Sequence, residues 1–315
     1  MKKALIMGGS YFIGKHVVDA LKKDYQVTVL NRGSNPLNDP LINEITCDRN
    51  DGTLLKSLLK NTPFHYVVDI SGYTKTQSEL LLDALDLNSL ETFVYISTSA
   101  AYNIQVLTPP FKETDALGGD SPFKDYAKNK IEAEQYLTQK LSEKALIIFR
   151  PPIVYGEDNY ILRERLAFYL VEHNLPIYVP KSDNTLSFVY VKDLAQEVKL
   201  SLQGNIPSGI YNVGNTSPLT FTQWVNLCAK VMKKSPVIVY VDEKNPLLDV
   251  RYYFPFFTYD NILSVKKIKT YSPSETPFET GLKRAYDDYL TLEEPIKIPQ
   301  KMLKMRETIK AIINH

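Results

Sequence analysis

The stretch Ala4-Leu-Ile-Met-Gly-Gly-Ser-Tyr-Phe-Ile-Gly14 decides the fold. A short apolar run is followed by three glycines and then by residues 15–22, whose apolar positions have helical spacing. This order predicts a strand, a tight turn at Gly8 and a helix that packs close to the sheet at Gly14. The N-terminus of such a helix presents unpaired N–H groups and a positive dipole to an anion such as a pyrophosphate. A strand–helix turn without a ligand is the alternative.

Apolar runs and helical segments alternate through the rest of the N-terminal half. This alternation predicts an α/β fold, a doubly wound parallel sheet with helices on both faces. In such sheets, ligands bind outside the carboxyl ends of the strands. Further strands are expected at 26–30, 43–47, 65–70, 92–97 and 145–149, and helices at 51–60, 75–85 and 123–141.

The second and third expected strands end in residues suited to a dinucleotide. Asn31 and Arg32 stand where an acidic residue would hydrogen-bond the ribose hydroxyls of NAD. Arg32 could instead pair with the 2′-phosphate of NADP, although a surface arginine explains it nearly as well. Asp48 is placed to contact an adenine amino group, with an Asx-turn or helix N-cap as the alternative. We therefore expect NAD(P) and favour NADP without excluding NAD.

Tyr126 and Lys130 lie four positions apart on an expected helix, which places both side chains on one face. A free phenol has a pKa of about 10, and a neighbouring ammonium lowers it. Such a pair can move a proton to and from a substrate hydroxyl while a cofactor carries a hydride. An amphipathic helix with a solvated lysine would give the same spacing.

Composition narrows the class of protein. The chain has 315 residues with 37 Lys+Arg and 36 Asp+Glu, so no overall basic field favours a nucleic-acid partner. The two cysteines, Cys47 and Cys228, lack the spacing of a disulfide framework or zinc site, and no metal site is predicted. The apolar run after Met1 is too short for a signal peptide, and no run could cross a membrane. We expect a cytoplasmic protein with a small-molecule substrate, and a homodimer remains one candidate assembly.

Taken together, the motifs resemble the extended short-chain dehydrogenase/reductase superfamily, specifically its NAD-dependent epimerase/dehydratase group. The resemblance covers about residues 1–215 and implies a Rossmann-like domain. The matching segments follow the family's order: 8–14, Ser97-Thr-Ser-Ala-Ala-Tyr102, Tyr126-xxx-Lys130, Arg150-Pro-Pro-Ile-Val-Tyr-Gly156, Phe188-Val-Tyr-Val-Lys-Asp-Leu-Ala195 and Tyr211-Asn-Val-Gly214.

The resemblance implies roles for individual residues. Tyr126 would transfer the proton, Lys130 would also hold the nicotinamide ribose, and Thr98 would hydrogen-bond the reacting oxygen. Thr98 and Tyr102 are candidate substrate contacts. Arg251, outside the family motifs, is a candidate phosphate partner, although a structural ion pair is the alternative for it. Cofactor contacts would come from Gly8, Gly9, Tyr11, Phe12, Ile13, Gly14, Asn31, Arg32, Asp48, Ser71, Tyr73, Ser97, Tyr126, Lys130, Pro151, Pro152 and Ile153.

The departures from the family pattern concern the substrate. Ser99-Ala100 replace the Asp-Glu pair of 4,6-dehydratases, and Ile153 and Leu186 replace two diphosphate contacts of sugar-nucleotide epimerases. The N-terminal turn together with Asn31-Arg32-Gly33 also resembles an atypical subgroup that includes chloroplast stem-loop RNA-binding proteins. Some members of that subgroup have lost the Tyr/Lys pair, which this chain keeps.

Residues beyond 215 predict a smaller α+β substrate domain. A helix is expected at 220–233, a strand at 237–241 and a helix near 278–290, and the aromatic cluster at 251–259 is expected to pack in a core or interface. We assign residues 1–155 and about 187–215 to the cofactor domain, and about 156–186 and 216–315 to the substrate region.

The sequence therefore predicts an NAD(P)-dependent oxidoreductase or epimerase acting on a hydroxyl-bearing substrate, a sugar or sugar nucleotide. The alternative is a cofactor-binding regulatory or RNA-binding protein with little or no catalysis.

Overall fold

A computed structural model describes residues 1–119, 123–254, 256–293 and 296–313. The chain divides into two compact units. The first contains residues 1–152, 191–214 and 263–275, and the second contains residues 153–190, 215–262 and 276–315. No helix within the described ranges is long and apolar enough to cross a bilayer.

The first unit is built on a seven-stranded parallel sheet with the order β11-β6-β5-β4-β1-β2-β3. Met7 lies opposite both Leu30 and Asp69, so β1, β2 and β4 end at the same level. The strand order reverses between β1 and β4, and ligands of open parallel sheets bind at such a point. The strands are β1 (Lys3–Met7), β2 (Gln26–Asn31), β3 (Ile42–Thr46), β4 (Tyr66–Asp69), β5 (Thr92–Ile96), β6 (Ala145–Arg150) and β11 (Gly209–Asn212).

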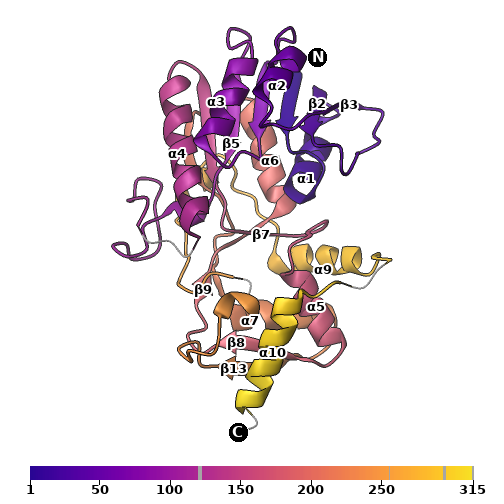
Figure 1. Cartoon of the computed structure of the whole chain (residues 1–315), viewed down its shortest axis with the longest axis vertical. Helices are drawn as coiled ribbons and strands as arrows, with labels where there is room; N and C mark the ends of the chain where they lie inside the picture. Colours follow the sequence, from indigo (N-terminus) through magenta and orange to yellow (C-terminus); the bar gives the residue numbers. More distant parts are fainter. Residues whose placement is uncertain (120–122, 255, 294–295, 314–315) are drawn as a thin grey trace. The chain divides into compact units, whose positions relative to one another are not determined.

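Helices cover both faces of this sheet, as the alternating pattern predicts (Figure 1). Helix α1 packs against α6 on one face, and α3 packs against both α2 and α4 on the other. The apolar stripes of α2, α3 and α4 meet the sheet in a core that includes Leu55, Leu81 and Leu137. The helices are α1 (Phe12–Leu21), α2 (Gly52–Leu59), α3 (Lys75–Ala84), α4 (Lys124–Lys140) and α6 (Val191–Leu202).

A late segment of the chain belongs to this first unit. Leu263 forms a β-bridge with Phe111, and Ser264 N donates to the carbonyl of Phe111 at 2.8 Å. Ile268 in α8 (Lys266–Lys269) is fully buried. These contacts place residues 263–275 in the first unit, with the seven-stranded sheet. The sequence analysis assigned them to the substrate region.

The second unit combines short strands with helices around an aromatic core. Trp224 stacks on Phe188 with ring centroids 4.2 Å apart, and Phe221 contacts Phe254 at 4.3 Å. The described part of the 251–259 cluster therefore packs in a core, as predicted, and Pro255 lies outside the described residues. Its elements are β7 (Ile153–Tyr155), α5 (Glu164–Glu172), β8 (Pro176–Pro180), β9 (Thr185–Leu186), β10 (Phe188–Tyr190), β12 (Leu219–Thr220), α7 (Phe221–Val231), β13 (Val237–Val241), α9 (Phe278–Tyr289) and α10 (Gln300–Ile313).

The unit boundary differs from the expected one by a few residues. Strand β7 pairs in parallel with β10, and neither strand joins the seven-stranded sheet. Residues 153–155 and 187–190 therefore belong to the second unit, whereas the sequence assigned them to the first. Apolar residues in both sheets give the same pattern, so the sequence alone did not separate them.

Candidate active site

The glycine-rich turn connects β1 to α1 at the level where the strand order reverses. Gly8 has a φ of +93°, a conformation that favours glycine, and a Cβ on Gly14 would overlap the carbonyl oxygen of Gly8. The N-cap residue Tyr11 makes no side-chain capping bond, and the first turn of α1 contains no acidic residue. This helix end is therefore suited to a negatively charged group, so the turn fits a dinucleotide pyrophosphate.

Gly14→Ala should prevent close packing of this turn. We expect a loss of about 1–3 kcal/mol in the free energy of unfolding and a loss of NADH binding, because the clash is with backbone. Urea unfolding and NADH fluorescence titration measure both effects. Gly52→Ala is the matched control, since its Cβ would meet only the end of the flexible Leu80 side chain at 2.6 Å. Equal effects of the two substitutions would contradict this reading of the turn.

Of the cofactor candidates at the ends of β2 and β3, Asn31 and Asp48 form local hydrogen bonds, whereas Arg32 is exposed. Asn31 accepts a hydrogen bond from Gly33 N at 2.7 Å and donates to Ser10 Oγ at 2.6 Å, so it organises the loop beside the turn. Arg32 is exposed and pairs with none of the described residues. Asp48 accepts from both Asn50 nitrogens at 2.9 and 2.8 Å, which is the Asx-turn alternative.

Lys130 lies at the centre of the predicted catalytic set. It is 2% exposed, and its Nζ donates to the carbonyls of Gly72 and Ile96, each at 2.6 Å. Gly72 follows β4 and Ile96 ends β5, so these two bonds join α4 to two strand ends. Burial is the main cause that lowers the pKa of Lys130 to about 8, and Asp69 opposes this shift.

The lowered pKa of Lys130 has a consequence for stability. The folded-state pKa of about 8 lies below the ordinary 10.5, so the unfolded chain binds more protons between these pH values. Wild-type stability should therefore rise relative to Lys130→Met from about pH 8 to 10.5, by on the order of 3 kcal/mol at most. Urea unfolding across this range tests it. The exposed Lys128→Met should show no such trend, and a flat difference for Lys130→Met would contradict the assignment.

The other members of the predicted set lie on the same helix or directly after β5. Tyr126 lies one helical turn before it on α4, is 36% exposed, and its ring centroid lies 5.7 Å from that of Tyr73. Thr98 follows β5 by two residues and is buried, and its Oγ1 accepts from Ala100 N at 3.1 Å. Ser97 Oγ is buried without a hydrogen-bond partner among the described residues.

Two predicted substrate contacts, Tyr102 and Arg251, are engaged by neighbouring side chains. Tyr102 is 1% exposed, and its hydroxyl donates to Asn212 Oδ1 at 2.7 Å and accepts from Arg150 Nη1 at 3.2 Å. This burial favours a structural role over the predicted substrate contact. Arg251 is exposed and forms an ion pair with Asp249 at 2.8 Å, the alternative stated for it.

The remaining cofactor candidates divide between the units. Pro151 and Pro152 are buried in the first unit, and the Pro151 carbonyl accepts from Ser99 N at 2.9 Å. Ile153 begins β7 in the second unit and is 1% exposed. Gly9 is buried beside β2, Tyr11 is the N-cap of α1, and Phe12 and Ile13 are its first two residues.

Sequence reasoning missed several buried residues around Lys130. Arg49 pairs with Asp69 through two hydrogen bonds of 2.7 and 2.9 Å, and Tyr95 donates its hydroxyl to the same Gly72 carbonyl at 3.0 Å. Glu134 accepts from Arg150 at 3.1 and 2.6 Å. The spacing of Lys130 and Glu134, one turn apart on α4, could have indicated the last of these.

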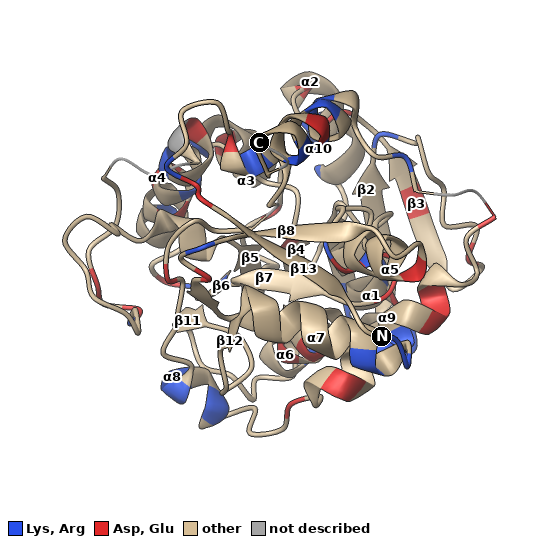
Figure 2. Cartoon of the chain, turned by 90° about the horizontal axis from the view of Figure 1, so that it is seen from below, with Lys and Arg blue, Asp and Glu red and all other residues tan. Residues whose placement is uncertain are grey.

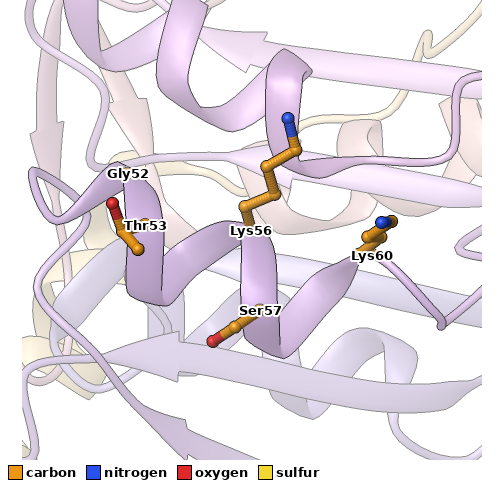
Figure 3. Close-up of a pocket in the computed structure, with 5 residues that line it drawn as sticks. All are labelled: Gly52, Thr53, Lys56, Ser57 and Lys60. Atoms are coloured by element: carbon orange, nitrogen blue, oxygen red, sulfur yellow. The ribbon is translucent and has the colours of Figure 1, made fainter.

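A separate hollow lies along α2 (Figure 3), lined by Gly52, Thr53, Lys56, Ser57 and Lys60. Lys56 and Ser57 point to opposite sides of the helix. None of these lining residues is a buried polar side chain, so the hollow lacks the character of a binding site.

The glycine turn on a doubly wound parallel sheet places the first unit among the Rossmann-like dinucleotide-binding proteins. The profile of the NAD dependent epimerase/dehydratase family matches residues 4–214, and the chain belongs to this family of enzymes.

Individual relatives carry several different activities. Chloroplast stem-loop binding protein of 41 kDa b from Arabidopsis thaliana is 32% identical over 287 residues, which cover 85% of this chain and 73% of the relative. Human dTDP-D-glucose 4,6-dehydratase is 25% identical and covers 80% of this chain and 81% of its own. The UDP-glucose 4-epimerase of Thermotoga maritima, solved with UDP-glucose, has the same fold, with a TM-score of 0.77, 21% identity, and coverage of 93% of this chain and 100% of its own.

Proposed function

We propose that this protein is an NAD(P)-dependent epimerase or oxidoreductase that acts at a hydroxyl-bearing carbon of a sugar or sugar nucleotide. The observation that carries the proposal is the buried Lys130, which two strand-end carbonyls hold one helical turn from Tyr126. A solvated lysine on an amphipathic helix would be exposed, so the burial argues against that alternative.

The residues suit proton transfer in the following way. Below about pH 8 Lys130 is cationic, and its charge stabilises the phenolate of Tyr126, which removes a proton from the substrate hydroxyl. Thr98 Oγ1 already accepts from Ala100 N, so its own proton is available to hydrogen-bond the developing carbonyl oxygen. A bound nicotinamide would supply the hydride chemistry.

Cofactor and substrate binding test the proposal directly. The first step is a titration with NAD(H) and NADP(H), and the second is a thermal-shift screen of sugar nucleotides against the cofactor complex. Ligands that bind the folded protein should raise its melting temperature by mass action. Failure of all four nucleotides to bind would contradict it.

Arg32 supports the finer proposal that the cofactor is NADP. Its guanidinium is exposed and unpaired among the described residues, so it could form a charge-assisted pair with a 2′-phosphate. Arg32→Ala should weaken NADPH binding about tenfold and leave NADH binding unchanged, as measured by fluorescence titration. Equal effects on both nucleotides would contradict this preference.

RNA binding is the second candidate, because a relative that is 32% identical is named as a stem-loop binding protein. Helix α8 carries three lysines in four residues and is one of the blue segments in Figure 2. Two of its lysines are engaged, since Lys267 donates to the Ile210 carbonyl and Lys269 pairs with Glu275. A steep loss of hairpin RNA binding with increasing salt would favour this candidate.

A further inference from the structure

Two charged residues that the proposed chemistry does not use lie near Lys130. Arg49 follows β3 and Asp69 ends β4, and they are 8% and 0% exposed. The two terminal nitrogens of Arg49 donate to the two carboxylate oxygens of Asp69 at 2.7 and 2.9 Å. Both oxygens are therefore engaged, and the pair carries no net charge.

Arg49 also holds the turn that follows β4. Its guanidinium donates to Ser71 Oγ at 2.9 Å and to the carbonyl of Gln77 at 3.4 Å. The turn folds back tightly, because a Cβ on Gly72 would overlap the Asp69 carboxylate. The Gly72 carbonyl is in turn an acceptor for Lys130 Nζ.

We propose that Arg49 is a positioning residue for Lys130: it neutralises Asp69 and fixes the 69–73 turn, so that the ammonium stays bonded to Gly72 and Ile96 instead of moving to the carboxylate. This inference rests on the proposed function, since it assigns Arg49 a role only through Lys130 and Tyr126.

The charges around the lysine support this arrangement. After burial, which is the main cause of the lowered pKa of Lys130, the largest effects come from Asp69, which raises that pKa, and Arg49, which lowers it. Glu134 also raises the pKa, but this carboxylate is paired with Arg150. The opposite effects of Asp69 and Arg49 on the pKa of Lys130 therefore largely offset each other while the two residues are paired.

Removing each partner should move the ionisation of Tyr126 in opposite directions. Arg49→Met leaves the Asp69 carboxylate unpaired, which disfavours a phenolate nearby and raises the pKa of Tyr126 by about one unit. Asp69→Asn leaves the Arg49 charge unpaired and lowers that pKa by a similar amount. The double variant carries neither charge, so the value should return close to that of the wild type.

The pKa can be measured without a substrate. Phenolate absorbance is followed against pH in the full-length wild type, in both single variants and in the double variant, each with and without Tyr126→Phe. The difference within each pair reports Tyr126 alone. If Arg49→Met does not fold, Asp69→Asn and the neutral double variant still decide the sign, because replacing both partners of a buried pair is tolerated best.

The outcomes separate the two proposals. Absence of a tyrosine with a lowered pKa in the wild-type difference would contradict the proposed function. If that tyrosine is present, opposite shifts in the single variants and a return in the double variant support the positioning role. Shifts of the same sign, or none, would show that Arg49 only stabilises the fold.

Discussion

Tyr126→Phe should lower kcat by about 10²–10⁴-fold, the usual contribution of a positioned general acid–base group. The substitution removes only the phenol oxygen, so the ring contact with Tyr73 and the affinity for cofactor should remain. The assay uses the sugar nucleotide that most raises the melting temperature of the cofactor complex.

The control for this substitution is Tyr136→Phe, which removes a half-buried phenol from the same helix. Its kcat should match the wild type, because Tyr136 packs beside Lys75 and Lys140, away from Lys130. A Tyr126→Phe enzyme that keeps kcat within tenfold of the wild type would show that another group transfers the proton.

Glu134→Ala should have the largest effect on stability, a loss of about 3–5 kcal/mol in the free energy of unfolding. It would leave the guanidinium of Arg150, whose side chain is 2% exposed, without its carboxylate partner. Urea unfolding measures the loss as a shift of the midpoint.

Glu132→Ala provides the matched control, because Glu132 lies on the same helix, α4, but is more exposed than Glu134. Glu132 pairs with Lys128 at 3.9 Å, and the two side chains are 44% and 73% exposed. Such an exposed i,i+4 pair contributes about 0.3–0.5 kcal/mol. Similar losses for Glu132→Ala and Glu134→Ala would contradict a stabilising role for the buried pair.

Many of the strands and helices could be predicted because their patterns are local. Strand β1 was expected at 4–7 and spans Lys3–Met7, and strand β13 was expected at 237–241 and has those bounds. Periodicity and glycine positions suffice for such elements.

The surroundings of Lys130 could not be predicted because they depend on the order of the strands. Arg49 follows β3 and Asp69 ends β4, and β1 and β2 lie between these strands in the sheet. The lysine itself bonds to two backbone carbonyls, which no side-chain pattern reveals. The Tyr126–Lys130 spacing predicted that both side chains share a helix face, but it did not predict the groups that hold Lys130.

The return of residues 263–275 to the first unit has a consequence for biosynthesis. A ribosome makes the whole seven-stranded sheet by residue 212, yet the segment that covers Phe111 and buries Ile268 emerges only after most of the second unit. Until residues 263–275 are made, we expect the apolar surface of the first unit that they contact to remain uncovered. The first unit is therefore completed only after residue 275 has been made, and we expect a fragment that ends before residue 263 to aggregate more readily than the intact first unit.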